Sequence, residues 1–402
     1  MLAPERRTRA DVFAACAIAL LVVVAAGAVW FTGDARGTES VTASTPAVPA
    51  ETALTVPDTL TESWRAASGA TAAPVAAGGA VVSGAGDTVT GHDPETGSAL
   101  WSYRRDRALC GVIGAWNTAV AVYPDDRGCG QVTQLDGSTG VRQAQRSSDA
   151  DPSVTLSEDG TYLTSRGDSR LEVWRSDLVR TLEFGRVDAP VNPGVQPRSG
   201  CALLSSGSSS SRLAVLESCP GEDGVRLDIL NPAPKDNSEP EEFGSTLLGD
   251  VARAAVLGVS GERTAVYVPG TPTAAASVAV FDGSGNETAR HPAPADVSPT
   301  ATVARTASFI SWWTGSTVIA LRTTDFTPLW SFPDALGPGA VMAGQVLVPV
   351  EGGIAVLDPV TGADLRRIPV DRPDSTPPRP VTTTVLGSVV VEQRGDELVA
   401  LR

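Results

Sequence analysis

Histidine and lysine are almost missing from this sequence. Of 402 residues, His92 and His291 are the only histidines, and Lys235 is the one lysine among 31 basic residues. Two histidines about 200 positions apart do not give the closely spaced ligand pair of a histidine zinc site. The sequence also lacks a Gly-x-Ser-x-Gly elbow and a phosphate loop ending in lysine, which argues against common hydrolase and nucleotide-binding motifs. We therefore expect no catalytic residues, no metal site and no cofactor.

Basic charge is also scarce, since the formal net charge is −15. Such an acidic chain is a poor partner for nucleic acid or for anionic lipid headgroups. The arginine bias among its basic residues is typical of a GC-rich genome, such as an actinobacterial one. We interpret the negative charge as a means of keeping the domain soluble.

Long apolar runs are absent except for one near the N-terminus. Residues 12–31 carry no charge, and Trp30 and Phe31 close the run. Twenty apolar residues are enough to cross a hydrocarbon core of about 30 Å. Because arginines precede the run, the positive-inside rule predicts a signal anchor with residues 1–11 in the cytoplasm and the rest of the chain outside. A cleaved signal peptide is the alternative, since Ala26-Gly27-Ala28 fits a small-residue cleavage site.

Residues 32–60 are rich in Thr, Ala, Pro, Ser and Glu and show little periodic hydrophobicity. This composition predicts a disordered linker. A flexible chain of this length would reach roughly 30 Å from the membrane.

Beyond residue 60 the chain repeats a short alternating strand, an Asp-x-x-Thr-Gly turn and a second strand. The Asp side chain can accept hydrogen bonds from turn amides, and Gly adopts positive φ without strain. Clear or partial copies contain the turn residues Asp93, Thr96, Gly97, Trp101, Asp136, Thr139, Gly140, Asp282, Asp358, Thr361 and Gly362. We interpret His92 as a solvated residue next to the first of these turns.

Weaker copies fill the gaps between the clear ones. The aligned positions are 93, 136, 175, 231, 282, 322, 358 and 402, so successive copies are 36 to 56 residues apart. This spacing brackets the 40–50 residues of a four-stranded propeller blade. The last copy ends at Arg402 without room for a fourth strand, which residues 61–65 can supply. We therefore predict an all-β, eight-bladed propeller over residues 61–402, closed at Trp64, with seven blades as the alternative.

Four cysteines lie in the predicted propeller. Cys110 and Cys201 lie at the start of inferred first strands, and Cys129 and Cys219 lie near the end of inferred second strands or just beyond it. Those two ends are neighbours in an antiparallel pair. We therefore predict the disulfides Cys110–Cys129 and Cys201–Cys219, which require an oxidising compartment.

The Asp-x-x-Thr-Gly-x-x-x-Trp pattern at Asp93 to Trp101 resembles the repeat of the PQQ-like β-propeller proteins. The resemblance implies an eight-bladed ring in which tryptophans dock neighbouring blades. That family includes quinoprotein dehydrogenases, which hold PQQ and calcium in the central channel, and outer-membrane assembly scaffolds that bind no cofactor. The present chain has no adjacent cysteine pair and no recognisable calcium ligand set, which favours the scaffold.

Trp312 and Trp313 are adjacent on one predicted strand, so their rings point to opposite sides. Packing of both rings between blades is the favoured interpretation, and a binding surface formed by at least one ring is the alternative. The sequence as a whole predicts a membrane-tethered, extracytoplasmic, non-catalytic scaffold that binds envelope proteins. The alternative functions are a quinoprotein-like oxidoreductase and a sensor that binds a small ligand or sugar in the channel.

Overall fold

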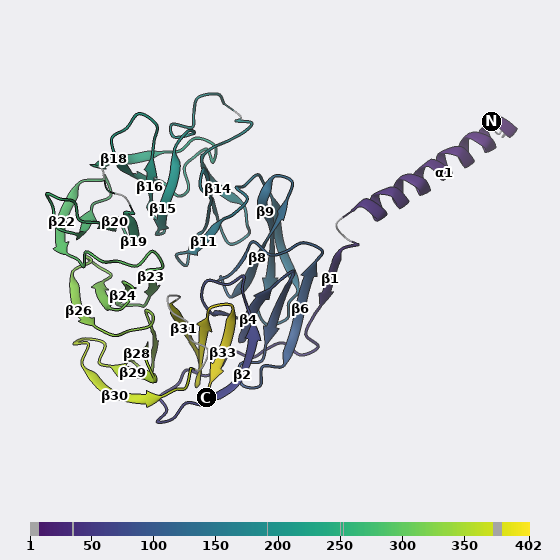
Figure 1. The fold of residues 1–402 in the computed structure, drawn as a ribbon. Coiled ribbons are helices and arrows are strands. Elements are labelled where there is room, and N and C mark those ends of the chain that lie inside the picture. The colour runs from purple at the N-terminus through teal and green to yellow at the C-terminus, as the bar shows by residue number, and fades with distance from the viewer. Residues whose placement is uncertain (1–7, 34–35, 191, 250, 252, 373–379) are drawn as a thin grey trace.

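A computed structural model describes residues 8–33, 36–190, 192–249, 251, 253–372 and 380–402. It contains one helix, α1 (Arg9–Thr32), which projects from a ring of sheets (Figure 1). Thr8 and Asp11 form a capping box at the start of α1. The segment Arg9–Phe31 has a mean hydropathy of 2.8 and none of it is buried in the protein, so α1 is long and apolar enough to span a membrane.

The described residues form eight antiparallel sheets arranged around a central axis (Figure 1). The first four blades consist of β3 (Val75–Ala77), β4 (Ala80–Ala85), β5 (Thr88–His92) and β6 (Ala99–Arg105); β7 (Gly111–Ala115), β8 (Thr118–Asp125), β9 (Gly128–Asp136) and β10 (Arg142–Ser147); β11 (Thr155–Glu158), β12 (Leu163–Arg166), β13 (Arg170–Trp174) and β14 (Arg180–Gly185); β15 (Ala202–Ser208), β16 (Leu213–Ser218), β17 (Val225–Leu230) and β18 (Glu242–Gly249).

In all eight blades the strands are named from the innermost to the outermost. The other four blades consist of β19 (Ala255–Ser260), β20 (Arg263–Val268), β21 (Ser277–Phe281) and β22 (Glu287–Pro292); β23 (Thr302–Arg305), β24 (Phe309–Trp313), β25 (Val318–Arg322) and β26 (Pro328–Phe332); β27 (Ala340–Met342), β28 (Gln345–Val350), β29 (Gly353–Leu357) and β30 (Asp364–Pro369); β31 (Val381–Leu386), β32 (Val389–Arg394), β33 (Glu397–Leu401) and β2 (Glu62–Ala67).

The two ends of the propeller close the ring, as predicted. Strand β2 pairs with β33, with Trp64 opposite Ala400. The backbone N–H groups of Thr61 and Arg402 each donate to the other residue's carbonyl oxygen. The eighth blade therefore combines strands from both ends of the domain, which removes two open sheet edges. The eight-bladed prediction is confirmed.

The repeated turns have a common geometry. In the first, Asp93 Oδ1 accepts hydrogen bonds from the backbone N–H of Glu95 and Thr96 and from the Thr96 hydroxyl. Gly97 follows with φ +72°. Asp136 and Asp358 form the same bonds with their own turn residues. The turn therefore satisfies the Asp carboxylate locally, which explains why this short motif recurs.

These turns also dock neighbouring blades. Trp64 Nε1 donates to Pro94 O at 2.9 Å, and its ring covers Gly97, where a Cβ atom would lie only 2.5 Å from Trp64 Cγ. The same contact recurs between Trp101 and Gly140 and between Trp330 and Gly362. Glycine is required in the turn both for its positive φ and for the space that the indole ring fills.

Most of the core lies between adjacent blades, in clusters that join strands of two consecutive sheets. Trp312 and Trp313 follow this rule. Trp312 packs toward Tyr267 of the preceding blade, whereas Trp313 packs toward the following blade and donates to Ala335 O at 2.7 Å. Both side chains are buried. The favoured interpretation, packing between blades, is confirmed, and the alternative of a binding surface at this pair is wrong, because each ring is buried in a different interblade core.

The predicted disordered linker differs most from the structure. Residues 38–60, here called the strap, lie along the propeller. Strand β1 (Thr38–Val41) pairs with β6 as a fifth strand of the first blade. Farther along, Val56 and Leu60 are buried against the seventh and eighth blades. The Thr/Ala/Pro composition hid this order because most of the strap's contacts use its backbone rather than a periodic apolar face.

Candidate functional site

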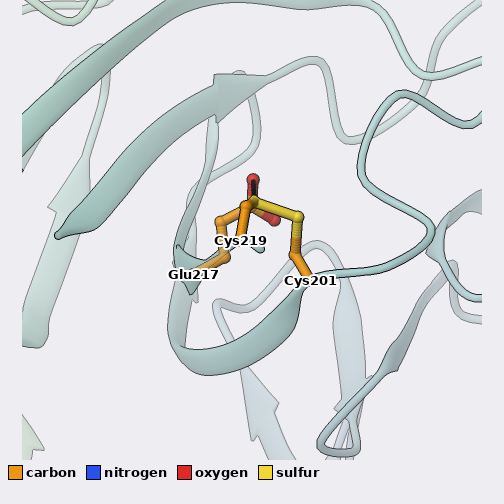
Figure 2. Close-up of side chains that lie close together, drawn as sticks. All are labelled: Cys201, Glu217 and Cys219. Atoms are coloured by element: carbon orange, nitrogen blue, oxygen red, sulfur yellow. Dashed lines mark hydrogen bonds between the residues drawn. A yellow bond between two sulfur atoms is a disulfide. The ribbon is translucent and has the colours of Figure 1, made fainter. Parts of the chain in front are cut away.

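A cluster of ionisable groups surrounds the disulfide of the fourth blade (Figure 2). Cys201 immediately precedes β15, Glu217 lies on β16, and Cys219 follows the end of β16. The Cys201–Cys219 disulfide is formed, as predicted. Glu217 Oε1 is 3.6 Å from Cys219 Sγ, and the carboxylate oxygen and both sulfur atoms lie within 4.8 Å of one another. A carboxyl group is thus held in contact with a disulfide.

The strands bring a second carboxylate and an arginine to the same place. Glu217 and Asp228 are both fully buried on the neighbouring strands β16 and β17. Arg198 Nε lies 3.0 Å from an oxygen of each. The Ser245 hydroxyl on β18 donates to the other Asp228 oxygen at 2.5 Å. One arginine therefore serves two buried carboxyl groups.

The resulting imbalance of charge affects the pKa of Glu217. Burial, followed by the nearby negative charge of Asp228, raises the pKa of Glu217 to about 9, although Arg198 acts in the opposite direction. Its Oε2 atom is buried and receives no hydrogen bond from a donor group, and a side-chain hydrogen bond with Asp228 also favours the protonated form of Glu217. Glu222, in the turn between β16 and β17, adds a further negative charge near it. At neutral pH, Glu217 is thus a protonated acid next to a disulfide.

The same three side chains have the ligand types that bind zinc. Thiolate sulfur and carboxylate oxygen are both zinc ligands. In the structure, however, both sulfur atoms are committed to the disulfide, and a disulfide supplies no thiolate. The oxidised cluster is therefore not a metal centre.

The other disulfide has different surroundings. Cys110 precedes β7 and is bonded to Cys129, which is the second residue of β9. Cys129 lies just beyond the end of the second strand, β8, and Cys219 lies just beyond β16, as predicted. Because Cys129 already belongs to the third strand of its blade, the two bridges do not occupy identical positions. Cys129 is buried in an apolar cluster that includes Val122 and Trp174. Among the described residues, the grouping of carboxylate and sulfur occurs only in the fourth blade.

The strap borders a cavity formed by four of the eight blades. This cavity of about 320 Å³ is lined by inner hairpin turns of the first, second, seventh and eighth blades and by strap residues 49–53. Ala43 and Ala47 donate their backbone N–H groups to Thr139 and Ser138 of the second blade. Gly79 makes room for the strap, because a Cβ there would lie 2.6 Å from the Val48 backbone. The strap therefore crosses the face that bears these turns.

A second group of buried charges lies between the second, third and fourth blades. Glu172 accepts from Arg170 at 2.8 Å and from Trp174 Nε1 at 2.9 Å, and it pairs with Arg146 at 3.0 Å. An open groove of about 560 Å³ borders these groups. Each of these arginines is paired with a buried carboxylate, so the network ties the blades together rather than presenting free charge.

His92 is more enclosed than its sequence position indicated. Its ring stacks on Trp64 with centroids 5.5 Å apart, and its ring nitrogens contact Ser83 Oγ and Gly97 O at 2.8 and 3.0 Å. Burial lowers the pKa of His92, although the contact with Gly97 opposes the shift. The expectation of a solvated residue is therefore wrong, because the ring-closing tryptophan covers the histidine.

Sequence reasoning placed the cysteines but missed Glu217, Asp228 and Arg198. A signal was present, because Glu217 and Asp228 lie in strands of mainly apolar residues, and a buried carboxyl group requires a partner. The identity of that partner could not be read in the same way. Arg198 lies on the loop before β15, and only the fold brings it to these strands.

No family model and no curated protein matches this sequence. Its fold is similar to solved structures at low identity. The computationally designed Ika8 protein is 15% identical, with a TM-score of 0.52 and coverage of 89% of this chain and 99% of that chain. BamB from Moraxella catarrhalis is 15% identical, with a TM-score of 0.50 and coverage of 85% and 97%.

The dihydro-heme d1 dehydrogenase NirN, solved in complex with DHE, is 14% identical, with a TM-score of 0.50 and coverage of 77% of this chain and 67% of that chain. These likenesses concern the arrangement of the blades. They support the propeller architecture reached from the repeat spacing, and this chain has an eight-bladed β-propeller fold.

Proposed function

We propose that this protein is a membrane-anchored, extracytoplasmic scaffold that holds envelope proteins at a fixed place beside the membrane and acts without catalysis. The observation that carries the proposal is the docking of β1 on β6, in which Thr38 pairs with Arg105 and Val41 with Ser102. This pairing makes the segment after α1 part of the propeller rather than a loose tether.

The docked strand leaves a short connection to the apolar helix. Only residues 33–37 separate α1, which ends at Thr32, from β1, which begins at Thr38. Six Cα-to-Cα steps span at most roughly 20 Å. With α1 in a bilayer, the first blade stays close to the membrane surface, and the ring has a restricted orientation. A platform needs such an orientation if it is to present one face to neighbouring proteins.

The chemistry of the chain supports the proposed side of the membrane. Two disulfides are formed, and disulfides persist in oxidising compartments outside the cytoplasm. Arginines precede the apolar helix in the sequence, which favours a cytoplasmic N-terminus. The propeller then lies outside the cell membrane.

The repeated turn carboxylates support binding rather than turnover as the task of the ring. Asp93, Asp136 and Asp358 each accept several hydrogen bonds from their own turn, so these carboxylates stabilise the fold. The resemblance to a repeat family that includes cofactor-free scaffolds points the same way. Variable turns on a rigid ring are a suitable surface for protein partners.

Site-specific photo-crosslinking in native membranes tests the scaffold. One crosslinker replaces Val360, which is 75% exposed in the turn between β29 and β30. A matched one replaces Asp126, exposed in the turn between β8 and β9 on the opposite face. We expect at least one face to give reproducible crosslinks to envelope proteins, identified by mass spectrometry. Recovery of only the protein itself from both positions would contradict the proposal.

Orientation needs its own control. Protease added to cells without their wall should digest the propeller and leave α1 protected. The same crosslinks should persist when α1 is replaced by an unrelated single-span helix. They should vanish in a variant that lacks residues 9–32 and is secreted without an anchor. Crosslinks that survive this deletion would show that membrane anchoring is not required.

A further inference from the structure

The disulfide of the fourth blade has the arrangement of a redox-active bond. Cys201 is buried, with 7% of its surface exposed, whereas Cys219 is partly exposed. An incoming thiolate can therefore reach the Cys219 sulfur more easily than the Cys201 sulfur. Thiol–disulfide exchange proceeds by attack on one sulfur and departure of the other as thiolate. Here the departing thiolate would be left in a buried site.

Glu217 is placed to supply a proton to a buried leaving thiolate. Its carboxyl group touches Cys219 Sγ and lies within 4.8 Å of Cys201 Sγ. The Oε2 atom is buried and receives no hydrogen bond from a donor group, and the carboxyl groups of Glu217 and Asp228 are joined by a side-chain hydrogen bond. The proton that Asp228 helps to hold on Glu217 therefore lies beside the disulfide, where a departing sulfur can take it.

We propose that Cys201–Cys219 undergoes thiol–disulfide exchange with an external dithiol, and that Glu217 donates the proton to the departing Cys201 sulfur. The co-reactant is a reduced dithiol, either a small molecule or a protein. This function is separate from the scaffold and does not depend on it. The exchange is stoichiometric, so it changes the state of the propeller rather than turning over a substrate.

The electrons and protons balance in two steps. A thiolate of the dithiol attacks Cys219 Sγ, a mixed disulfide forms, and the bond between the two cysteines breaks. Its electron pair passes to Cys201 Sγ, which takes the proton of Glu217. The second thiol of the dithiol then attacks the mixed disulfide and releases Cys219. Cys219 leaves as a thiolate and takes up from solvent the proton that the first thiol had lost there, while Glu217 recovers its proton from the second thiol through solvent. The protein thus gains two thiols and the dithiol becomes a disulfide.

The charges around Glu217 keep it ready for this role. Arg198 contacts Oε1, Asp228 faces Glu217 from β17, and Glu222 lies in the following turn. Two negative neighbours and burial outweigh one arginine and keep the proton on Glu217 at neutral pH. Glu217 is therefore protonated before the exchange begins.

The Cys110–Cys129 bond is an internal control in the same molecule. It closes a loop of similar length, with a sequence separation of 19 against 18. Its buried cysteine packs in an apolar cluster and borders a small cavity that Asp149, Arg170 and Glu172 also line. Among the described residues, however, no carboxyl group forms with both of its sulfur atoms the close grouping that Glu217 forms in the fourth blade. We expect this bond to be the slower of the two.

The experiment measures both bonds in the intact, detergent-solubilised protein. The probe is dithiothreitol at pH 7, with timed alkylation and peptide mass spectrometry to give a rate for each disulfide. Cys201–Cys219 should open at least about 10-fold faster than Cys110–Cys129, since general acid catalysis contributes factors of 10²–10⁴. The variant Glu217→Gln should slow the first bond about 10-fold or more and leave the second unchanged.

The sign of the effect separates catalysis from loosening. Glutamine is neutral and nearly isosteric with protonated Glu217, and any local loosening it caused would speed reduction. Glu262→Gln makes the same change at a distant side chain that is 67% exposed and should alter neither rate. Equal rates for Cys201–Cys219 in wild type and Glu217→Gln, or faster reduction in the variant, would overturn the proposal.

Discussion

The second and fourth blades each carry one disulfide, and the two bonds differ in what surrounds them. Both join residues 18 or 19 positions apart, and in each one cysteine is buried and the other partly exposed. In the second blade the buried cysteine packs in an apolar cluster, and the charged side chains that share a small cavity with it, Asp149, Arg170 and Glu172, form no close group with both sulfur atoms. In the fourth blade it lies beside Glu217, Asp228 and Arg198. Similar cysteine spacing thus gives two different chemical environments.

The difference teaches that the disulfide and its environment are set at separate levels. The cysteine positions follow from the hairpin geometry of a blade. The surroundings follow from which side chains the neighbouring strands and loops place against the sulfur atoms. Judged by loop length alone, both disulfides would be simple structural cross-links. A charged residue on a neighbouring strand changes the chemical environment of one of them.

Loss of Arg198 should have the largest effect on this contrast. The variant Arg198→Ala leaves Glu217 and Asp228 buried without their shared cation. Removing one partner of a buried ion pair costs about 3–5 kcal/mol. The free energy of unfolding, measured by urea denaturation, should fall by this amount.

A matched surface arginine sharpens this result. Arg127, near the disulfide of the second blade, has a side chain that is 50% exposed and pairs with Asp149. Arg127→Ala should change the free energy of unfolding by less than about 1 kcal/mol. Similar losses for the two variants would show that the buried cluster is not special.

Removal of each disulfide compares the bonds directly. Cys110→Ala with Cys129→Ala, and Cys201→Ala with Cys219→Ala, open loops of nearly equal length. Chain entropy predicts a loss of about 3 kcal/mol for each pair. Urea denaturation of the double variants would measure this. A much larger loss in the fourth blade would mean that the bond also holds the carboxyl cluster in place.

Ser245→Ala tests one hydrogen bond of the cluster. The Ser245 hydroxyl donates to the buried carboxylate of Asp228, and hydrogen bonds to charged groups contribute about 1.5–3 kcal/mol. Thermal and urea denaturation should show a loss of about 2 kcal/mol. Ser211→Ala, whose hydroxyl is exposed, should show a much smaller loss.

The pH dependence of stability gives the finest comparison. The pKa of Glu217 is about 9 in the folded protein against 4.5 ordinarily, so the folded state holds a proton that the unfolded chain releases. Its contribution to stability is complete below pH 4.5 and is lost as pH rises toward 9, at about 1.4 kcal/mol per pH unit. Glu217→Gln removes this pH dependence, so the free energy of unfolding of the variant should rise relative to that of the wild type between pH 5 and 8. A constant difference would contradict the raised pKa.

Much of the architecture could be predicted from local patterns. The Asp-x-x-Thr-Gly turns, the blade spacing and the closing position of Trp64 all appear in the structure. They are predictable because each depends on short-range chemistry: a carboxylate over turn amides, a glycine with positive φ, and an alternating strand. The candidate site was not predictable in this way, because Arg198 and Asp228 come from different segments of the fourth blade.

The strap and Trp312–Trp313 show where local patterns fail. Strap residues Val56 and Leu60 are isolated apolar positions whose burial depends on a surface made by the seventh and eighth blades. Adjacent tryptophans on a strand point to opposite sides, but the sequence does not say that both sides are covered. In a propeller each blade has a neighbour on both faces, so both rings are buried.

The sequence by itself determined the repeat, the number of blades, the apolar helix and the disulfide pairs, because these depend on patterns within tens of residues. Only the tertiary structure decided the course of the strap, the enclosure of His92 and the proton on Glu217. These depend on which distant groups come into contact, and burial and neighbouring charge exist only after the ring has closed.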